Sequence, residues 1–350
     1  MTRIVHTGDM HFDSPFAALP ASVARLRREE LRGTFLRILD SVKSYRADIL
    51  LISGDMFDSR FVTAETFSFL REGFAKISDT AVFVAPGNHD FLSENSLYKT
   101  VDFGRNVHIF GEDFESVEVG DAVVYGRGFG RRFAKESLLP SSFRHTGEKA
   151  GILLMHGDVG TESDYNPVSE TLLSQTGLTY AAFGHIHSYS GIRNAGEVKY
   201  AYCGIPEGRH FDEEGICGFI QGEISPGNVN LSFVPSCKRQ NITLEVDVSS
   251  LSSVESVLTK IRTMLEKDNL YKIILCGNIS NVFFIDTDIL QKELADACLY
   301  IKVKDNTRKT AIIEEESFLE KRFTDRLSGR NDAVGRMALQ FGLEALRGQR

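Results

Sequence analysis

Two strand-helix-strand patterns in the N-terminal part of the chain restrict it to folds that contain a parallel sheet. Residues 22–46 carry apolar side chains at positions 23, 26, 31, 35, 38, 39 and 42, the spacing of an amphipathic helix. The run that follows, DILLISGD, is apolar without alternation, which predicts a strand buried on both faces. A helix near 63–77 and the run AVFVAPGNHD repeat the pattern. Since a helix between two buried strands implies a parallel crossover, we predict an α/β (α+β) fold.

The rest of the chain divides into three further kinds of pattern. Shorter β-like runs over 107–236 predict two sheets packed face to face with helices outside. After SCKRQ at 236–240, a βαββ-like unit begins with ITLEVDV, a helix from about 251 to 266, YKIILCG and LYIKVKD. The acidic EEES at 314–317 leads into two helical stretches. We predict a main domain over 1–238, a small α/β capping domain over 239–313 and a helical tail over 314–350.

The composition is that of an ordinary globular protein. The 350 residues are 42% hydrophobic and 25% charged, and the net charge of −8 argues against a protein that coats nucleic acid, though not against a local basic surface. Five widely spaced cysteines without a CxxC pair indicate reduced, mostly buried thiols. The first ten residues already resemble a strand, and no apolar run approaches membrane-spanning length. We expect a soluble, cytoplasmic protein with no membrane partner.

Polar side chains follow five of the predicted strands at the point where each strand ends. The clusters are Asp9 and His11; Asp55 and Asp58; Asn88, His89 and Asp90; His156; and His185 and His187. Asp9 and His11 are two residues apart, which in an extended chain puts both on one face. Taken singly, each cluster could be a turn, or a hydrogen-bonded histidine of the core. Together, at the edge where open α/β sheets place their sites, they predict a functional site.

The motifs DxH, GDxxD, GNHD, HG and GHxH, in this order, resemble the calcineurin-like metallophosphoesterase superfamily over residues 3–237. Within it, HTGDMHFDSPF, LLISGDMFDS and GIPEGRHF are similar to the bacterial DNA-repair exonuclease branch, which contains SbcD-like and YhaO-like nuclease subunits. The resemblance implies a four-layer αββα fold, in which helices flank a two-sheet β-sandwich. It also implies metal-dependent hydrolysis of phosphoesters.

By the same resemblance, two divalent ions share the site and Asp55 bridges them. The ligands of one ion would be Asp9, His11, Asp55 and His187. The ligands of the other would be Asp55, Asn88, His156 and His185. Carboxylate and imidazole ligands without thiolate suit Mn²⁺, Fe or Zn²⁺, and the resemblance favours Mn²⁺.

The resemblance gives His89 a catalytic role instead of a ligand role. In the family this histidine faces the scissile phosphate and protonates or stabilises the leaving oxygen. Asp90 is the expected partner that orients its ring. Asp58 is expected either to accept a hydrogen bond that fixes a neighbouring ligand or loop, or to be a simple helix N-cap or turn residue.

Polar residues outside the five motifs have simpler interpretations. His6, on the first predicted strand, is expected in the core, while His108 and His145 have no companions and stay unassigned. Arg209 and His210 could hold a phosphate beside the cleft, but a tight turn with a surface pair is favoured.

Two basic segments favour a polynucleotide substrate, namely DNA. The first predicted helix carries seven arginines and lysines, Arg27 and Arg32 among them, against three acids. The stretch GRGFGRRFAK is a glycine-punctuated basic loop that suits contacts to backbone phosphates. Its cations are Arg127, Arg131, Arg132 and Lys135. A solvated loop with unremarkable charge is the alternative.

The C-terminal part points in the same direction by resemblance. Similar nucleases continue into a capping domain that helps hold duplex DNA, and then into helices that dock on an SMC-like ATPase subunit. The tail carries apolar residues at 334, 337, 339, 341, 343 and 346, but a tail packed on its own domain would look the same. The family tends to form two-fold dimers, and FLSENSLYKTVDF is helical enough to contribute to a homodimer.

We therefore predict a dinuclear metal-dependent phosphodiesterase that hydrolyses DNA, as the exonuclease or endonuclease subunit of a double-strand-break repair complex. One alternative is a small-molecule or cyclic-nucleotide phosphodiesterase. Another is a DNA-end-binding scaffold with a structural metal site, against which the complete motif set and His89 argue.

Overall fold

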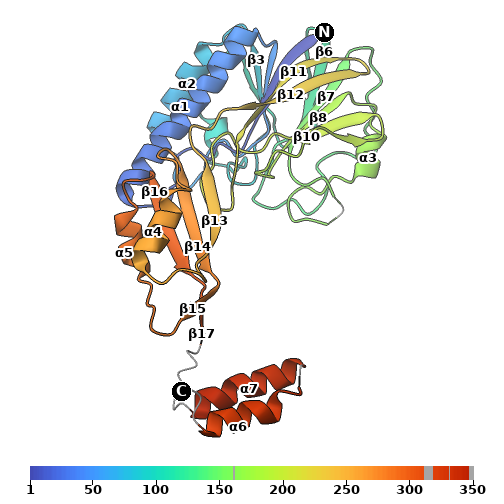
Figure 1. Ribbon diagram of the computed structural model, residues 1–350. Coiled ribbons are helices and arrows are strands. Elements are labelled where there is room, and N and C mark those ends of the chain that lie inside the picture. Colours follow the sequence, from blue (N-terminus) through green and yellow to red (C-terminus); the bar gives the residue numbers. More distant parts are fainter. Residues whose placement is uncertain (161, 311–317, 331, 347–350) are drawn as a thin grey trace. The chain divides into compact units, whose positions relative to one another are not determined.

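The computed structural model describes residues 1–160, 162–310, 318–330 and 332–346. The chain forms two compact units, Met1–Ile242 with Asp268–Leu270, and Thr243–Lys267 with Tyr271–Arg350 (Figure 1). The predicted domain limits at 238 and 313 stay predictions. The acidic segment 314–317 lies outside the described residues.

The first sheet of the larger unit contains the two predicted crossovers. Its strands, in spatial order, are β12 (Asn228–Pro235), β11 (Gly218–Ser225), β1 (Thr2–Thr7), β2 (Ile49–Ile52), β3 (Ala81–Val84) and β4 (Val107–Ile109). Strands β1 to β4 are parallel, while β11 pairs antiparallel with both β1 and β12. Helices α1 (Ala21–Tyr45) and α2 (Ala64–Ala75) connect β1 to β2 and β2 to β3, and they cover one face of this sheet (Figure 1). Both predicted crossovers are confirmed.

The second sheet packs against the other face of the first. Its strands, in spatial order, are β5 (Glu115–Val119), β6 (Ala122–Gly126), β7 (Ala150–His156), β8 (Tyr180–Gly184), β10 (Val198–Tyr202) and β9 (Arg193–Ala195). The four central strands are parallel and both edge strands are antiparallel. The short helix α3 (Glu170–Ser174) and loop side chains such as Leu139 and Val168 cover its outer face. The predicted α/β fold is confirmed: two mixed sheets flanked by helices, with small C-terminal sheets and helices.

The strands of the first sheet contribute to two apolar layers. In β2, Leu50 and Ile52 pack with the helices, whereas Ile49 and Leu51 lie between the two sheets. All four side chains are fully buried. Because neither face of this strand meets solvent, its sequence shows no alternation of apolar and polar residues.

The smaller unit contains a three-stranded sheet, a two-stranded sheet and four helices within its described residues. The larger of these sheets is β13 (Asn241–Asp247), β14 (Leu270–Cys276) and β16 (Tyr300–Asp305), and the smaller is β15 (Asn278–Ser280) and β17 (Arg308–Thr310). The helices are α4 (Val254–Arg262), α5 (Thr287–Glu293), α6 (Phe318–Leu327) and α7 (Ala333–Leu346). The last two form a helical hairpin (Figure 1).

Two predictions of local structure need correction. Helix α5 was missed because seven residues show too little periodicity, although Asp286 caps it by accepting hydrogen bonds from two backbone N–H groups. The stretch 91–103, predicted as helical, forms only the 3₁₀ turn η1 (Leu97–Lys99). Tertiary bonds fix this backbone instead: the Leu92 N–H donates to the Phe129 carbonyl, and the Tyr98 hydroxyl donates to Asp90.

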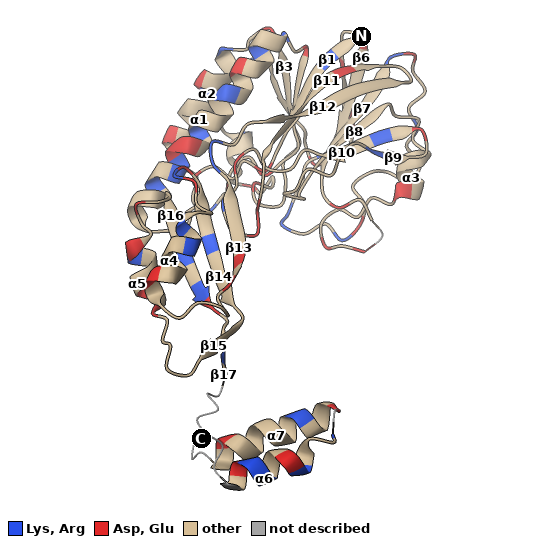
Figure 2. Cartoon of the chain, in the orientation of Figure 1, with Lys and Arg blue, Asp and Glu red and all other residues tan. Residues whose placement is uncertain are grey.

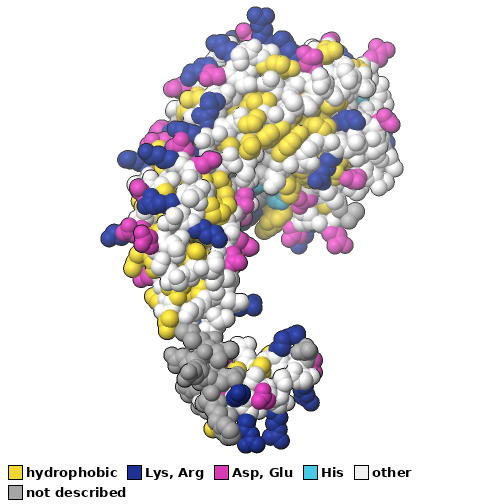
Figure 3. Space-filling view, viewed as in Figure 1, with side chains coloured by type: hydrophobic (Ala, Val, Ile, Leu, Met, Phe, Trp, Pro, Cys, Tyr) yellow, Lys and Arg dark blue, Asp and Glu magenta, His cyan; other side chains and the backbone are white. Residues whose placement is uncertain are grey.

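The surface carries charge of both signs. Arginines, lysines and acids alternate along α1 (Figure 2), and basic and acidic side chains are interspersed over the visible face of the larger unit (Figure 3). Among the described residues, no helix combines the length and the apolar character that crossing a membrane requires.

Candidate metal centre

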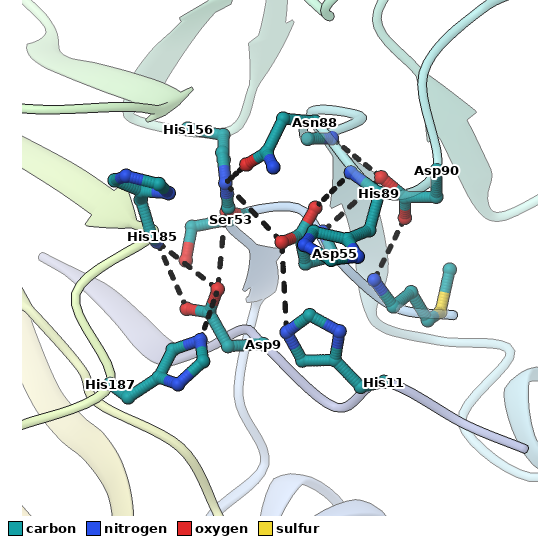
Figure 4. A network of polar contacts seen from close by, with 12 residues as sticks. Asp9, His11, Ser53, Asp55, Asn88, His89, Asp90, His156, His185 and His187 are labelled. Carbon is teal, nitrogen blue, oxygen red and sulfur yellow. Dashed lines mark hydrogen bonds and ion pairs between the residues drawn. The ribbon is translucent and has the colours of Figure 1, made fainter. Parts of the chain in front are cut away.

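The predicted site residues meet at the carboxyl ends of strands from both sheets. Loops after β1, β2 and β3 supply one half of the cluster, while β7 and the loop after β8 supply the other (Figure 4). The side chains that converge are Asp9, His11, Asp55, Asn88, His89, His156, His185 and His187. Parallel strands end at the same edge, so residues far apart in sequence come together there.

The backbone of the site has an unusual conformation. Asp9, His11 and Asp55 have φ angles of +51°, +47° and +49°, in the left-handed region that side chains with a Cβ rarely adopt. The expectation that Asp9 and His11 share a face of an extended chain is therefore wrong. Two backbone bonds hold this geometry: Asp9 N–H donates to Gly54 O and His11 N–H to Asp55 O, both at 2.9 Å.

Two glycines allow the loops to approach this closely. Gly54 has a φ of +90°, and a Cβ there would lie 2.7 Å from His156 Nδ1. A Cβ on Gly87 would overlap Asp55 Oδ1. Any larger residue at either position would displace a predicted metal ligand.

Potential ligand atoms gather in overlapping groups of three. Asp9, Asp55 and His156 form one fully buried group, and Asp9, His11 and His187 form another, with ligand atoms within 4.8 Å of one another. His11 is 1% exposed, yet neither ring nitrogen has a hydrogen-bond partner among the described residues. A buried imidazole without a partner is costly unless a cation binds it. This residue therefore fits a metal ligand.

His156 and Asn88 also fit a cation. The Nδ1–H of His156 donates to the Ser53 carbonyl at 2.9 Å, which leaves Nε2 as a lone pair. This nitrogen lies 2.8 Å from Asn88 Oδ1 and 3.5 Å from Asp55 Oδ2. In the neutral ring all three atoms are acceptors, and a cation bound between them would satisfy this arrangement.

The two carboxylates at the centre supply negative charge and are themselves buried. Asp9 and Asp55 are each 1% exposed. Burial raises the pKa of Asp9 to about 6, and the neighbouring Asp55 carboxylate adds to this effect. Divalent cations would neutralise both groups. The buried aspartate and histidine clusters are thus consistent with a dinuclear metal site.

His185 lies beside this cluster in a different setting. Its backbone N–H donates to both oxygens of Asp9 at 3.1 Å, and its ring lies 5.1 Å from that of His156. Its Nε2 lies 3.7 Å from Asp158 Oδ2, and the ring packs on Tyr165. The role of His185 as a ligand stays a prediction.

His89 lies at the open side of the centre, with 35% of its side chain exposed. The predicted partner Asp90 does not hold its ring. Asp90 is fully buried and accepts bonds from the backbone of Asp55, Met56 and Gly87 and from a tyrosine hydroxyl. Both its oxygens are occupied, so the assignment of Asp90 as the residue that orients His89 is wrong.

The carboxylate beside the His89 ring belongs to Asp58. Asp58 Oδ2 lies 3.6 Å from His89 Nδ1, and these two residues form a third group with His11. Asp58 does not cap a helix, since Thr63 caps α2. Of the two roles expected for Asp58, the structure favours a polar contact to a site residue.

Sequence reasoning missed a buried acid next to the centre. Glu213, 7% exposed, lies 2.7 Å from His187 Nδ1 and 2.7 Å from an Arg209 nitrogen. The Arg209 side chain is only 8% exposed, so the favoured interpretation of a surface pair is wrong. The stretch DEEG reads as solvated turn sequence, and only its position after GRHF could have suggested a role.

His6, His108 and His145 lie outside the centre and contact other residues. His6 is fully buried between the Tyr180 hydroxyl and the Ser53 hydroxyl, as expected for the core, and burial lowers its pKa to about 3. His108 lies near Glu115, and His145 bonds the Tyr125 hydroxyl.

Part of the basic face predicted for the first helix is engaged inside the protein, while four of its seven cations are exposed, namely Arg25, Arg37, Lys43 and Arg46. Arg27 is 1% exposed and pairs with Glu30 at 2.6 Å and Glu207 at 2.7 Å. Arg32 pairs with Asp13 at 3.3 Å and with Glu65. These two arginines therefore do not form a DNA surface.

The predicted basic loop borders a cavity of about 610 Å³. Arg127 braces the loop by donating to the backbone carbonyls of Glu112 and Leu138, at 2.6 Å and 3.5 Å. The other three cations are exposed: Arg131, Arg132 and Lys135.

Comparison with known proteins identifies the family. The model of the calcineurin-like phosphoesterase family matches residues 2–189. The chain belongs to this family. With the buried aspartate and histidine clusters, the match makes it a metal-dependent phosphoesterase. Calcineurin-like phosphoesterase sequence thus runs from β1 through the loop that carries His185 and His187.

Relatives of this calcineurin-like phosphoesterase are distant. The uncharacterized metallophosphoesterase YhaO of Bacillus subtilis (strain 168) is 27% identical over 243 residues, 65% of this chain and 59% of that protein. The DNA double-strand break repair protein Mre11 of Methanococcus maripaludis is 21% identical over 319 residues, 84% of this chain and 83% of that protein. The chain thus spans about three fifths of the YhaO length.

Among solved structures, the crystal structure of TT1561 of Thermus thermophilus matches with a TM-score of 0.41 and 10% identity. The match covers 67% of this chain and 99% of that one.

Proposed function

We propose that this phosphoesterase is a nuclease that hydrolyses phosphodiester bonds of DNA, as the catalytic subunit of a double-strand-break repair complex. The observation that carries the proposal is a buried aspartate and histidine centre with His89 at its open side and an exposed cationic, aromatic loop in the same unit. The similarity to an Mre11 protein named for DNA double-strand break repair supports the choice of DNA.

The residues of the centre divide the chemistry between them. Divalent ions held by these residues would lower the pKa of a bound water and neutralise charge on the phosphoryl group. The His89 backbone N–H donates to Asp55 Oδ1 at 2.8 Å, which holds the histidine at the rim of the centre. Its ring, with Asp58 on the Nδ1 side, presents Nε2 to donate a proton to the leaving oxygen.

The donor set also bears on the metal. Oxygen and imidazole nitrogen surround the centre, and the nearby Cys203 is buried with its Sγ beside Ser53 and the Gly204 carbonyl. Carboxylate, amide and imidazole donors suit Mn²⁺, which we propose as the bound metal.

An aromatic series connects the basic loop to the centre. Phe133, 44% exposed, has Arg132 over its ring at 5.7 Å. Its ring lies 5.6 Å from Tyr165, whose ring lies 4.7 Å from His185. Aromatic rings flanked by cations are how proteins hold unstacked bases while binding the backbone. This loop therefore supports a polynucleotide substrate.

The proposal is tested by measuring cleavage of a labelled linear DNA duplex with Mn²⁺ and with EDTA. We expect cleavage with Mn²⁺ and none with EDTA. Bis(p-nitrophenyl) phosphate and cyclic nucleotides are compared in parallel. A protein that hydrolyses only the small substrates would be a small-molecule phosphodiesterase, and one that binds DNA ends without hydrolysing any substrate would be a scaffold.

The basic loop provides the discriminating variants for this assay. Phe133→Ala is expected to weaken DNA binding by about 1–3 kcal/mol per stacked base. DNA binding weakens as salt increases, and the slope of log K against log salt concentration is about −0.9 per phosphate contact. Replacing Arg131 and Lys135 by alanine should make this slope shallower by about 0.9 for each contact that is lost. Neither change should slow bis(p-nitrophenyl) phosphate hydrolysis. Arg105→Ala, at an exposed arginine before β4, is the control.

The C-terminal hairpin is the proposed docking site for an SMC-like ATPase. Phe323 and Gly342 lie so close that a Cβ on Gly342 would clash with the phenylalanine ring, so the two helices pack tightly on each other. Large apolar side chains nevertheless stay exposed on the hairpin: Leu319, Val334, Met337, Phe341 and Leu346. Exposed apolar side chains on a packed hairpin support a partner surface.

Deleting residues 318–350 tests this docking role. We expect the truncated protein to keep its metal content and its hydrolysis of bis(p-nitrophenyl) phosphate, because the centre lies in the larger unit. Co-purification of the ATPase with the truncated protein should be lost. Aggregation or a much lower melting temperature would instead show that the tail stabilises the fold.

A further inference from the structure

A short segment between β10 and β11, residues 207–213, carries an acid that contacts the metal centre. Glu213 Oε1 lies 2.7 Å from His187 Nδ1. Glu213 is 7% exposed, and the chemistry proposed above gives it no part. A buried carboxylate that bonds the ring nitrogen of a predicted ligand histidine, on the side away from the metal, can fix the orientation of that ring.

The same carboxyl group is held in place by its own segment. Arg209 donates to it twice, from its backbone N–H at 2.6 Å and from its guanidinium at 2.7 Å, and the His210 N–H donates at 3.3 Å.

The Glu213 carboxyl takes three N–H donors from its own segment, and its Oε1 is the nearest acceptor to His187 Nδ1, at 2.7 Å, while an Arg209 nitrogen lies farther from the same atom, at 3.3 Å. This contact places the imidazole N–H of His187 on Nδ1. The Nε2 atom then carries the free lone pair that a metal ion can bind. It lies 4.0 Å from Asp9 Oδ1, in the group that also contains His11. We infer that Glu213 is a positioning residue that fixes the tautomer and ring orientation of His187 for metal binding. This inference rests on the metal-dependent phosphoesterase centre and is independent of DNA as substrate.

Hydrogen bonds to other elements hold the 207–213 segment, and with it Glu213, in position. At its start, Arg27 of α1 donates to Glu207 at 2.7 Å and to the Gly208 carbonyl at 2.9 Å. The Thr34 hydroxyl also donates to Glu207, at 2.7 Å. The Asn241 amide donates to the His210 carbonyl at 2.9 Å. The buried Arg27 thus stabilises a segment that ends at the metal centre.

Glu213→Gln tests the inference with little change of shape. The carboxylate of Glu213 accepts hydrogen bonds at both oxygens, whereas the amide of glutamine has one oxygen that accepts and one NH₂ group that donates. In the variant, the NH₂ group would therefore face either the Nδ1–H of His187 or the N–H groups of Arg209, and that contact would be lost. We expect the dissociation constant for Mn²⁺, measured by calorimetry on metal-free protein, to rise about ten- to hundredfold. Excess Mn²⁺ should restore much of the lost bis(p-nitrophenyl) phosphate hydrolysis. Glu213→Ala should show an equal or larger loss of affinity.

The exposed neighbour Glu214 provides the matched control, and Glu214→Gln should leave Mn²⁺ affinity unchanged. The melting temperature of metal-free Glu213→Gln should stay near that of the parent, while the increase on adding Mn²⁺ shrinks. A variant that binds Mn²⁺ with the parent's affinity would overturn the inference. So would a fall in melting temperature that is the same with and without Mn²⁺, because it would make Glu213 purely structural.

Discussion

Asp55→Ala is expected to lose at least one equivalent of bound metal together with phosphoesterase activity. The Asp55 carboxylate lies 3.6 Å from His11 Nε2 and 3.5 Å from His156 Nε2, so it is within reach of predicted ligands of both ions, as the predicted bridging role needs. Ligand binding stabilises the folded state by about 2.7 kcal/mol when the free ligand exceeds its dissociation constant a hundredfold. The variant should therefore also lose much of the stabilisation that Mn²⁺ gives the parent.

Elemental analysis and thermal denaturation with and without Mn²⁺ measure this effect. Asp113→Ala, at an exposed aspartate of the same unit, should behave like the parent. Two full equivalents of metal in purified Asp55→Ala would contradict the bridging assignment.

His89→Asn is expected to keep the metals and DNA binding but to cleave DNA roughly a hundred to ten thousand times more slowly. His89 is at the open side of the centre, and its ring contacts Asp58 and packs 4.9 Å from the ring of His11. A general acid acts only in the transition state, so its loss slows the reaction without weakening ground-state binding. The deficit should shrink on a substrate that releases p-nitrophenolate, because this leaving group needs little protonation.

Metal content, DNA affinity and both rates should be measured on one preparation of His89→Asn. An equal rate loss on both substrates with the metals retained would rule out the acid role. Loss of metal would instead make His89 a ligand. Its position in one group with His11 and Asp58 would then account for that role. Asp58→Asn should give a smaller rate loss in the same direction, since Asp58 acts only through the His89 ring.

The site could be predicted from the strand ends because the end of a buried strand is visible in the sequence. A buried parallel strand such as β2 is a continuous apolar run, so the sequence shows where it begins and ends. The first polar residues after the run lie at the edge of the sheet. Asp55, which follows β2, and His156, which ends β7, could therefore be placed together without coordinates. The crossover helices were equally readable, because α1 buries one stripe along its length.

Errors arose where a side chain had more than one possible partner. Asp90 and Asp58 both follow predicted strands near His89, and sequence proximity favoured Asp90. In the fold, Asp90 is occupied by three backbone N–H groups and a hydroxyl, which leaves Asp58 for the histidine. The cations of α1 show the same limit, since Arg27 finds Glu207, 180 residues later in the chain.

The sequence by itself determined the class of fold, the family and the residues that meet at the centre, because periodicity and motif order are local properties of the chain. Only the tertiary structure decided which carboxylate lies beside which histidine: Asp58 beside His89, at 3.6 Å, and Glu213 beside His187, at 2.7 Å. The physical reason is that such a short contact depends on the packing of distant segments. Neither the DEEG stretch nor the spacing of its residues encodes that packing locally.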